Sequence, residues 1–304
     1  METSMRNKIS LSELAESLGI KWLGDNIEID GLGFCGGETN YRALLSFVLN
    51  ENYVEEVRDN NAIVCLVLPE KLLDCYSEEK LGRAISYIIS DRPKRLFYTI
   101  HEHLCKTGNF YEVFDFEPVI GEACEIAESA VIEKGVVIGN NVTIGPNTVV
   151  RPGSIIDDNT YIGCNTTIGS EGFQSLIEGD SLPMHITHVG RCHICEDVYI
   201  GDNTCICNSL FEGETYIGRG AQIDNLVHVA HNLYIGAGAI VTAHVILCGS
   251  SRIEEDAWLG PNSSVLNGVV VGKGAKVGLA SVVTRNVLPD TVVYGSPAKV
   301  HEKK

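Results

Sequence analysis

The sequence has little positive charge and no long apolar run. Lys and Arg number 23 against 40 Asp and Glu, so the formal net charge is −17. A field of that sign repels nucleic-acid phosphates and anionic lipids, so we expect neither as a partner. No stretch approaches the roughly 18 uncharged apolar residues of a membrane-spanning helix. The first twenty residues carry charges throughout, and we do not expect them to be a signal peptide.

Cysteine, by contrast, is plentiful. The eleven cysteines cannot all pair with one another, and a pool of reduced thiols is typical of the cytosol. The chain has 304 residues, which is enough for two domains with a sizeable core. We therefore expect a soluble, cytoplasmic protein with no stable membrane insertion.

An aliphatic residue recurs at every sixth position through most of the chain. The period runs from Ile120 to Ile168 without a miss, stops for a non-repeating stretch, and continues to Val283 with a slip of one residue after Ile206. A period of six fits neither an amphipathic helix nor an alternating strand. It fits a triangular parallel β-helix, in which each hexad is a short strand plus a corner where Gly, Asp or Asn often supplies the turn. The 24 hexads predict roughly eight coils of three strands, stacked about 4.8 Å apart.

The residues before the repeat predict a separate small α/β domain. Ser10 and Glu13 form a capping-box pattern for a short helix that a glycine ends. The segment 61–69 is apolar enough for a buried strand, and Pro93 is placed to open a helix running to about His103.

The chain is accordingly expected to be mainly β and to have three parts. These are an α/β domain at 1–105, a β-helix domain at 106–288 with a loop insertion at 170–188, and a tail at 289–304 beyond the last hexad. The period by itself does not give the handedness of the β-helix.

Gly31, Gly33 and Gly36 spell G-x-G-x-x-G after a plausible strand. No acidic residue follows at the place where a dinucleotide-binding fold needs one. We therefore expect no dinucleotide site.

The cysteines of the repeat raise the question of zinc. Cys195 and Cys207 are twelve residues apart, which places them on different faces of the prism, where they cannot share one ion. Cys192 falls in a small inward slot, so we expect packing cysteines and no metal. The candidate zinc ligands of this region are Cys192, Cys195, Cys205, Cys207 and His193.

His188 and His193 are similar to the metal histidines of the γ-class carbonic anhydrases, which share this prism. That family needs a third histidine about two coils upstream, and the region around Arg151 has none. No metal site is expected there either.

His231 follows the inward-facing Val229 by two residues, so its side chain is expected to point outward. A surface imidazole is often only solvated. Imidazole is also the side chain best suited to take a proton from an amine or hydroxyl near neutral pH.

Several short segments now identify a family. They occur in the order "IGSEGF" (168–173), "VGR" (189–191), "IGDNT" (200–204), "IDN" (223–225) and "VAHN" (229–232). The repeats resemble the hexapeptide acyltransferase superfamily, whose prism is left-handed. The five segments, in this order, resemble the UDP-3-O-acylglucosamine N-acyltransferases, lipid A enzymes that N-acylate a UDP-amino sugar. The resemblance extends over nearly the whole chain.

The resemblance implies roles for particular residues. His231 corresponds to the general base, and Gly249 to the backbone N–H donor that stabilises the tetrahedral oxyanion. Phe47, Asn50 and Tyr53 match an F-x-x-N-x-x-Y motif in which two rings sandwich uracil and the Asn reads its edge. The alternative is that both aromatics are core residues. The other substrate-binding residues expected are Phe173, Asn225, His228 and Asn232.

The sequence departs from that family in three ways. Gly268 stands where the family has a second histidine, and His228 replaces the usual Gln. The C-terminal helix that helps dock an acyl carrier protein is missing. The ending "GSPAKVHEKK" resembles instead the close of hexapeptide acetyltransferases that use acyl-CoA.

The last forty residues carry a local charge of +4, against −21 for the rest of the chain. A basic end on an acidic body suits the phosphates of CoA, although a solubilising tail would look the same. The residues expected near the acyl donor are Gly268, Arg285 and Lys299, with Lys273 and Lys276 as further phosphate contacts.

These observations together predict an N-acyltransferase with a left-handed β-helix. It would move an acyl group from acyl-CoA or an acyl carrier protein to the amine of a nucleotide-linked amino sugar, such as UDP-3-O-acylglucosamine or a related UDP- or dTDP-sugar. The resemblance implies a homotrimer, no metal and no permanently bound cofactor. The alternative is a catalytically silent trimeric β-helix that binds nucleotide sugars or serves as a scaffold.

Overall fold

The computed structural model describes residues 7–36, 41–108, 110–179 and 182–301. The chain forms two compact units, 1–112 with 174–187, and 113–173 with 188–304. In the described ranges, none of the helices has the length and apolar character needed to span a bilayer.

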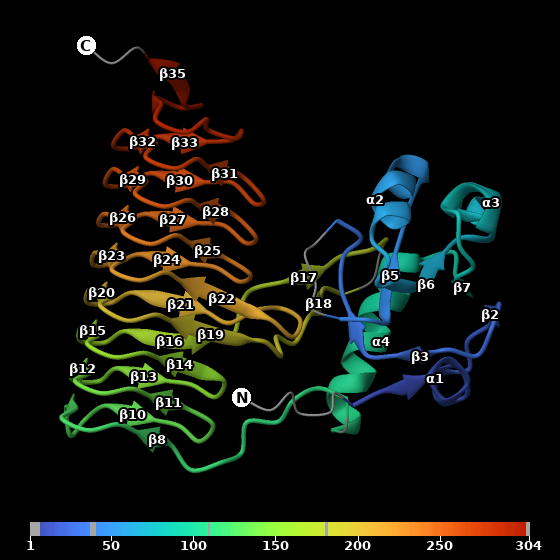
Figure 1. Cartoon of the computed structure of the whole chain (residues 1–304), viewed down its shortest axis with the longest axis horizontal. Coiled ribbons are helices and arrows are strands. Elements are labelled where there is room, and N and C mark those ends of the chain that lie inside the picture. The colour runs from blue at the N-terminus through green and yellow to red at the C-terminus, as the bar shows by residue number, and fades with distance from the viewer. Residues whose placement is uncertain (1–6, 37–40, 109, 180–181, 302–304) are drawn as a thin grey trace. The chain divides into compact units, whose positions relative to one another are not determined.

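The second unit is a left-handed parallel β-helix with three faces, which we call the first, second and third sheets (Figure 1). The first sheet contains β8 (Val119–Ile120), β11 (Val137–Ile138), β14 (Ser154–Ile156), β19 (Arg191–Ile194), β22 (Glu214–Ile217), β25 (Tyr234–Ile235), β28 (Arg252–Ile253) and β31 (Val270–Val271). The second sheet contains β9 (Glu125–Ile126), β12 (Thr143–Ile144), β15 (Tyr161–Ile162), β20 (Tyr199–Ile200), β23 (Gln222–Ile223), β26 (Ile240–Val241), β29 (Trp258–Leu259), β32 (Lys276–Val277), β34 (Val292–Tyr294) and β35 (Lys299–His301). The third sheet contains β10 (Val131–Ile132), β13 (Val149–Val150), β16 (Thr167–Ser170), β21 (Cys205–Cys207), β24 (His228–Val229), β27 (Ile246–Leu247), β30 (Ser264–Val265) and β33 (Val282–Val283).

The hexad period is confirmed as the interior of this prism. Its aliphatic residues stack from coil to coil and are buried, as at Ile144, Ile162 and Ile200. Ile120 is 46% exposed because it belongs to the open first coil. Many corners place an Asn or Asp in the left-handed backbone region, which these residues tolerate better than most.

The C-terminal tail is not beyond the β-helix, which corrects the expected boundary at 289. β34 pairs with β32 in parallel, so Val293 takes the inward position above Val277 and is 3% exposed. β35 then folds back antiparallel to β34. The tail therefore extends the second sheet.

The first unit is a small α/β fold around the sheet β2-β7-β6-β5-β4. Its strands are β2 (Trp22–Leu23), β4 (Gly31–Leu32), β5 (Leu44–Phe47), β6 (Ile63–Leu68) and β7 (Ser86–Ile89), with β1 (Ile9–Ser10) and β3 (Glu28–Ile29) as a separate pair. Its helices are α1 (Leu11–Leu18), α2 (Val54–Asp59), α3 (Glu78–Leu81) and α4 (Pro93–Thr107), and η1 (Glu51–Tyr53) and η2 (Glu70–Tyr76) are 3-10 turns. β6 and the capping box of α1 are as predicted.

The loop insertion belongs to the first unit. β17 (Ser175–Leu176) and β18 (Met184–His185) form an antiparallel hairpin. The Thr187 N–H donates to Glu102 Oε1 at 2.7 Å, and the Thr187 carbonyl lies 2.8 Å from His101 Nε2. Since Glu102 and His101 lie in α4, this helix anchors the hairpin. The boundary expected at residue 105 falls within α4.

Candidate active site

The corner between the third and first sheets brings the expected catalytic residues into one column. Val229, Leu247, Val265 and Val283 are in register on successive coils. The residues two positions further along therefore recur at the same corner, about 4.8 Å apart per coil. They are His231, Gly249, Asn267 and Arg285. Asn267 was not singled out from the sequence, although its spacing from Gly249 repeats that of Gly249 from His231.

Asn232 holds the imidazole of His231 in one tautomer. The Leu210 N–H can only donate a hydrogen bond, and it reaches Asn232 Oδ1 at 3.0 Å, so this atom is the carbonyl oxygen. Asn232 Oδ1 also lies 2.8 Å from His231 Nδ1. His231 Nδ1 must therefore carry the proton, which leaves Nε2 as the basic nitrogen. Asn232 Nδ2 completes the arrangement by donating to Ser209 Oγ at 2.7 Å.

Gly249 lies against the basic nitrogen of His231. A Cβ added at Gly249 would sit 2.6 Å from both Nε2 and Cε1 of that ring. Gly249 has an ordinary negative φ, so the reason for glycine here is space and not backbone conformation. Its N–H donates to no other backbone group among the described residues. The N–H at the corresponding position of most other corners also has no backbone acceptor. Gly249 differs from those residues because it faces the imidazole of His231.

Two breaks in the hexad period build this corner. The slip after Ile206 creates a longer turn, which supplies Ser209 and the Leu210 N–H to Asn232. The excursion, residues 174–187, leaves the prism after Phe173, and the chain returns at His188. The His188 ring meets the His231 ring edge to face, with 5.1 Å between their centroids. The sequence singles out His188 only as a possible metal ligand, and it does not predict this contact. Breaks in a period are the signal that could have found it.

Burial is the main influence on the ionisation of His231. The side chain is 8% exposed, and desolvation lowers its pKa below the ordinary value. The hydrogen bond with Asn232 opposes this shift, and the nearby His228 adds to it. His231 is therefore neutral at pH 7 and able to accept a proton.

The other expected substrate residues of the β-helix are distributed over several positions. Asn225 occupies the corner between the second and third sheets, where its Oδ1 accepts from the Asp202 N–H at 2.6 Å. His228 is exposed on the outer face of the third sheet, opposite Cys205. Phe173 is 84% exposed at the start of the excursion. Asn232 is the member of this set that lies within hydrogen-bond distance of His231.

The expected donor residues are also dispersed. Arg285 shares the column of His231 and lies three coils away, or about 14 Å. Lys273 forms an ion pair with Glu255, and Lys276 and Lys299 belong to the second sheet. Gly268 lies beside Asn267 in an exposed turn with a φ of +68°.

In the first unit, Phe47 ends β5 at the carboxyl edge of parallel strands, where open α/β sheets bind ligands. Its ring packs 4.9 Å from that of Phe97, so it is also a structural residue. Asn50 caps η1 by accepting from the Asn52 N–H at 3.0 Å, and Tyr53 is 43% exposed.

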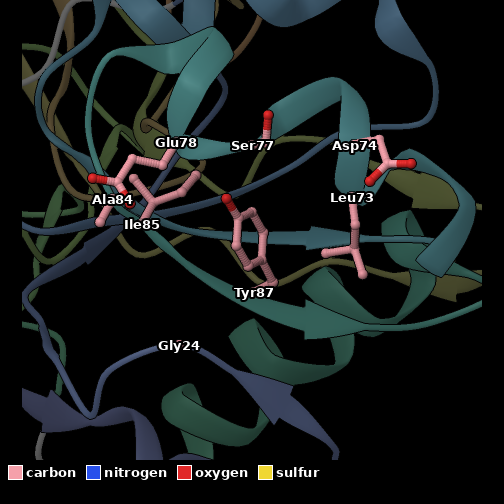
Figure 2. A pocket seen from close by; sticks show the side chains of 8 residues that line it. All are labelled: Gly24, Leu73, Asp74, Ser77, Glu78, Ala84, Ile85 and Tyr87. Atoms are coloured by element: carbon pink, nitrogen blue, oxygen red, sulfur yellow. The ribbon is translucent and has the colours of Figure 1, made fainter.

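A cavity of about 400 Å³ lies in another part of this unit (Figure 2). None of Phe47, Asn50 and Tyr53 lines it. Its walls are Gly24, Leu73, Asp74, Ser77, Glu78, Ala84, Ile85 and Tyr87.

The cysteines of the repeat take different environments. Cys192 is fully buried in the prism, as expected of a packing residue. Cys205 and Cys207 instead flank the inward Ile206 and lie with His228 on the outer face of the third sheet. Hydrogen bonding from Cys207, and then from His228, lowers the pKa of the Cys205 thiol.

His193 forms a charged cluster on the first sheet. Its Nε2 lies 2.9 Å from Asp157 Oδ2 and its Nδ1 3.4 Å from Glu214 Oε2. Hydrogen bonding to Glu214, and then to Asp157, raises the pKa of His193 to about 9. Its imidazole is therefore a cation at neutral pH.

The prism and its repeat define the class of hexapeptide-repeat proteins. The family model "Bacterial transferase hexapeptide (six repeats)" matches residues 117–152 and 135–170. Residues 117–170 thus carry the repeat that this family model describes, and the chain has sequence relatives named UDP-3-O-acylglucosamine N-acyltransferase.

One such relative, from Methylobacterium nodulans, is 36% identical over 131 residues, which are 43% of this chain and 37% of the relative. Another, from Wolinella succinogenes, is 34% identical over 137 residues, or 44% and 42% of the two chains. The chain thus spans about two fifths of the length of the curated relatives it matches. A solved UDP-N-acetylglucosamine acyltransferase from Bacteroides fragilis aligns with a TM-score of 0.49 at 23% identity, covering 62% of this chain and 73% of that one.

Proposed function

We propose that this chain is an N-acyltransferase that acts on the amine of a nucleotide-linked amino sugar and takes its acyl group from a thioester. The observation that carries the proposal is the single tautomer of His231, whose basic Nε2 faces the backbone of Gly249. The names of the relatives favour the same chemistry.

In the proposed reaction, the substrate amine attacks the thioester carbonyl carbon while His231 Nε2 takes the amine proton. The resulting tetrahedral oxyanion is stabilised by the Gly249 N–H. When the C–S bond breaks, the imidazolium returns its proton to the departing thiolate. The products are an amide and a free thiol, and His231 is neutral again.

Asn232 is a positioning residue in this scheme. Its carbonyl oxygen accepts a hydrogen bond from the His231 Nδ1–H throughout the cycle and stabilises the imidazolium when it forms. His188 closes one side of the ring and limits the access of water.

The nucleotide is proposed to bind to the first unit. The carboxyl-edge position of Phe47 and the exposure of the Tyr53 ring support a stacking site for a base. Asn50 would read the edge of that base.

The acyl donor is proposed to be acyl-CoA with a short acyl group. Arg285 supports this, because it is the expected phosphate contact that lies in the column of His231. An acyl carrier protein is acidic and would meet the −17 net charge of this chain unfavourably.

A homotrimer and a cytoplasmic location belong to the same proposal. The superfamily resemblance implies active sites between subunits. All eleven cysteines lie in the described ranges and are free thiols, which is usual in a reducing compartment.

The test is a matrix of acyl donors and amino sugars. The purified chain is mixed with acetyl-CoA, longer acyl-CoAs and acyl carrier thioesters, each with UDP- and dTDP-amino sugars, and thiol release and the N-acylated product are measured. We expect turnover that falls by about 10²–10⁴-fold in His231→Ala and is unchanged in His244→Ala, an exposed histidine at another corner. Nucleotide-sugar binding without turnover for any pair would overturn the proposal and favour the silent scaffold.

A further inference from the structure

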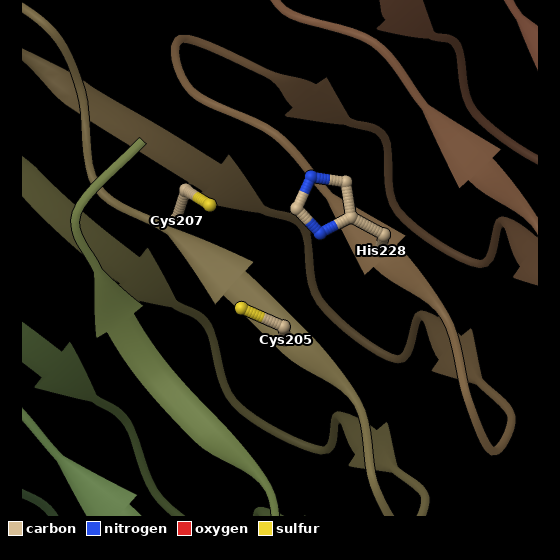
Figure 3. Close-up of side chains that lie close together, drawn as sticks. All are labelled: Cys205, Cys207 and His228. Carbon is tan, nitrogen blue, oxygen red and sulfur yellow. The ribbon is translucent and has the colours of Figure 1, made fainter. Parts of the chain in front are cut away.

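The outer face of the third sheet brings two thiols and an imidazole together. Cys205, Cys207 and His228 each offer one ligand atom, and these atoms lie within 4.8 Å of one another (Figure 3). The three side chains come from neighbouring coils, β21 and β24, in which Cys205 and His228 are paired directly.

A local irregularity of the sheet lies beside the cluster. Cys205 and Cys207 flank the inward Ile206, so both point away from the prism interior. At this point the pairing of β21 with β16 shifts its register, so that Cys207 lies opposite Ser170. The extra residue of this bulge, Gly169, lies in β16, and Cys207 is 3% exposed.

The ligand set and its spacing suit a tetrahedral ion. With Zn–S distances near 2.3 Å, two thiolates of one tetrahedral site lie about 3.8 Å apart. The separations here are within 4.8 Å, which rotation of the side chains can close. Two Cys and one His leave a fourth position open, and the exposure of His228 places that position toward solvent.

We propose that Cys205, Cys207 and His228 form a binding site for one Zn²⁺ ion. This zinc site is separate from the proposed nucleotide-base site of the first unit. No step of the proposed acyl transfer depends on the zinc ion. Its occupancy would fix the orientation of His228, which lies on β24 three residues before His231.

A second cluster, Asp157, His193 and Cys195, is a weaker candidate. Both ring nitrogens of His193 already face carboxylates, from Asp157 and Glu214, so the imidazole is engaged as a cation. A protonated imidazole cannot ligate a metal.

The experiment titrates the reduced, chelator-treated chain with Zn²⁺ by calorimetry, and with Co²⁺ by absorbance. We expect one ion per chain, and a thiolate-to-cobalt charge-transfer band with tetrahedral ligand-field bands. Cys207→Ser and His228→Gln should each weaken Zn²⁺ binding by at least about 100-fold. Cys248→Ser is the matched control, since this thiol lies outside the cluster, and it should bind as the wild type does.

Circular dichroism and the melting temperature establish that each variant is folded. His228 is exposed, so His228→Gln tests the site without disturbing the core. Absence of binding at micromolar Zn²⁺, or an affinity unchanged in both His228→Gln and Cys207→Ser, would overturn the proposal. Neither result depends on acyltransferase activity, so the metal site and the proposed function can fail separately.

Discussion

Gly249 and His231 are in contact between adjacent coils, and the imidazole of His231 occupies the space that a side chain at position 249 would need. The added Cβ would lie 2.6 Å from His231 Nε2, well inside contact distance. Ser250 N–H donates to the His231 carbonyl at 2.9 Å, so the backbones of the two coils cannot separate easily. A larger residue at 249 must therefore displace the ring.

Gly249→Ala tests this relationship. We expect the alanine to push His231 off its position and to lower kcat by about 10²-fold, because misplacing a catalytic group by about 1 Å has that effect. The measurement is steady-state turnover with the best donor and acceptor pair, together with the melting temperature.

Gly220→Ala is the control for that variant. Gly220 has a φ of +66°, and an added Cβ would meet nothing within 4 Å among the described residues. This change strains the backbone and should cost roughly 1 kcal/mol of stability without altering kcat. Equal kcat values for the two variants would show that the Gly249 contact is irrelevant to turnover.

Asn232 should set the pH dependence of turnover. Asn232→Asp keeps both acceptor bonds and adds a negative charge beside Nδ1, so the pKa of His231 should rise. The acid limb of kcat/KM should then move to higher pH, whereas in the wild type it lies below the ordinary histidine range. Asn232→Ala loses the tautomer lock and should lower kcat at every pH. A pH profile of Asn232→Asp identical to that of the wild type would exclude the positioning role.

His193 should make the chain less stable as the pH rises above neutrality. Its folded pKa is about 9, above the unfolded value of 6.5. The folded state therefore binds more protons between these values, and the stabilisation is complete below pH 6.5 and lost as the pH passes 9. Since the side chain is partly solvated, we expect up to about 2 kcal/mol. Melting temperatures from pH 6 to 10 should fall more steeply for the wild type than for His193→Gln; parallel curves would refute the assignment.

Tyr53 and Phe47 should respond differently to truncation. Tyr53 is 43% exposed, so Tyr53→Ala should leave the melting temperature unchanged and raise the KM for the sugar nucleotide. Loss of one ring–base stack corresponds to a rise of roughly 5- to 100-fold. Phe47→Ala should also destabilise the first unit, because its ring packs on Phe97. An unchanged KM in folded Tyr53→Ala would place the base elsewhere.

Arg285 should matter more than Lys299 for the donor. Charge reversal by Arg285→Glu is expected to raise the KM for acetyl-CoA about fivefold at low salt, with a smaller effect at high salt. Lys299→Glu should have a weaker effect, because Lys299 lies on the second sheet. Arg219→Glu, at the corner between the first and second sheets beside Asp197, is the control for net charge. If all three reversals act alike, the effect reports overall charge only.

The repeat could be predicted from the sequence because each hexad buries its own aliphatic residue. The inward positions of Ile144 and Ile162 follow from their own hexads. The start of α1 at Ser10 is likewise determined locally, by its capping box. The family motifs gave His231 and Gly249 as candidates, and the register places them together.

Neighbours across the breaks could not be predicted in this way. In regular coils, neighbouring residues on adjacent coils are 18 positions apart in the sequence, as are Glu122 and Asn140. This separation becomes 23 across the long turn after Ile206 and 38 across residues 174–187. Cys205 and His228 are partners only because of the first of these changes. The tail was misplaced for a similar reason, since Val293 reaches its inward position by a spacing that the period of six does not contain.

The hairpin of residues 174–187 also determines the order in which the chain can fold during synthesis. Ile186 and Leu176 are buried in the first unit, and Thr187 bonds to Glu102. The N-terminal unit therefore cannot be completed on the ribosome until residue 187 has emerged, by which time the opening coils of the prism have already been made. A chain released before that point would expose the surface of α4 that the hairpin covers. Truncation at residue 112 cannot separate the two units, because residues 174–187 of the first unit interrupt the sequence of the second.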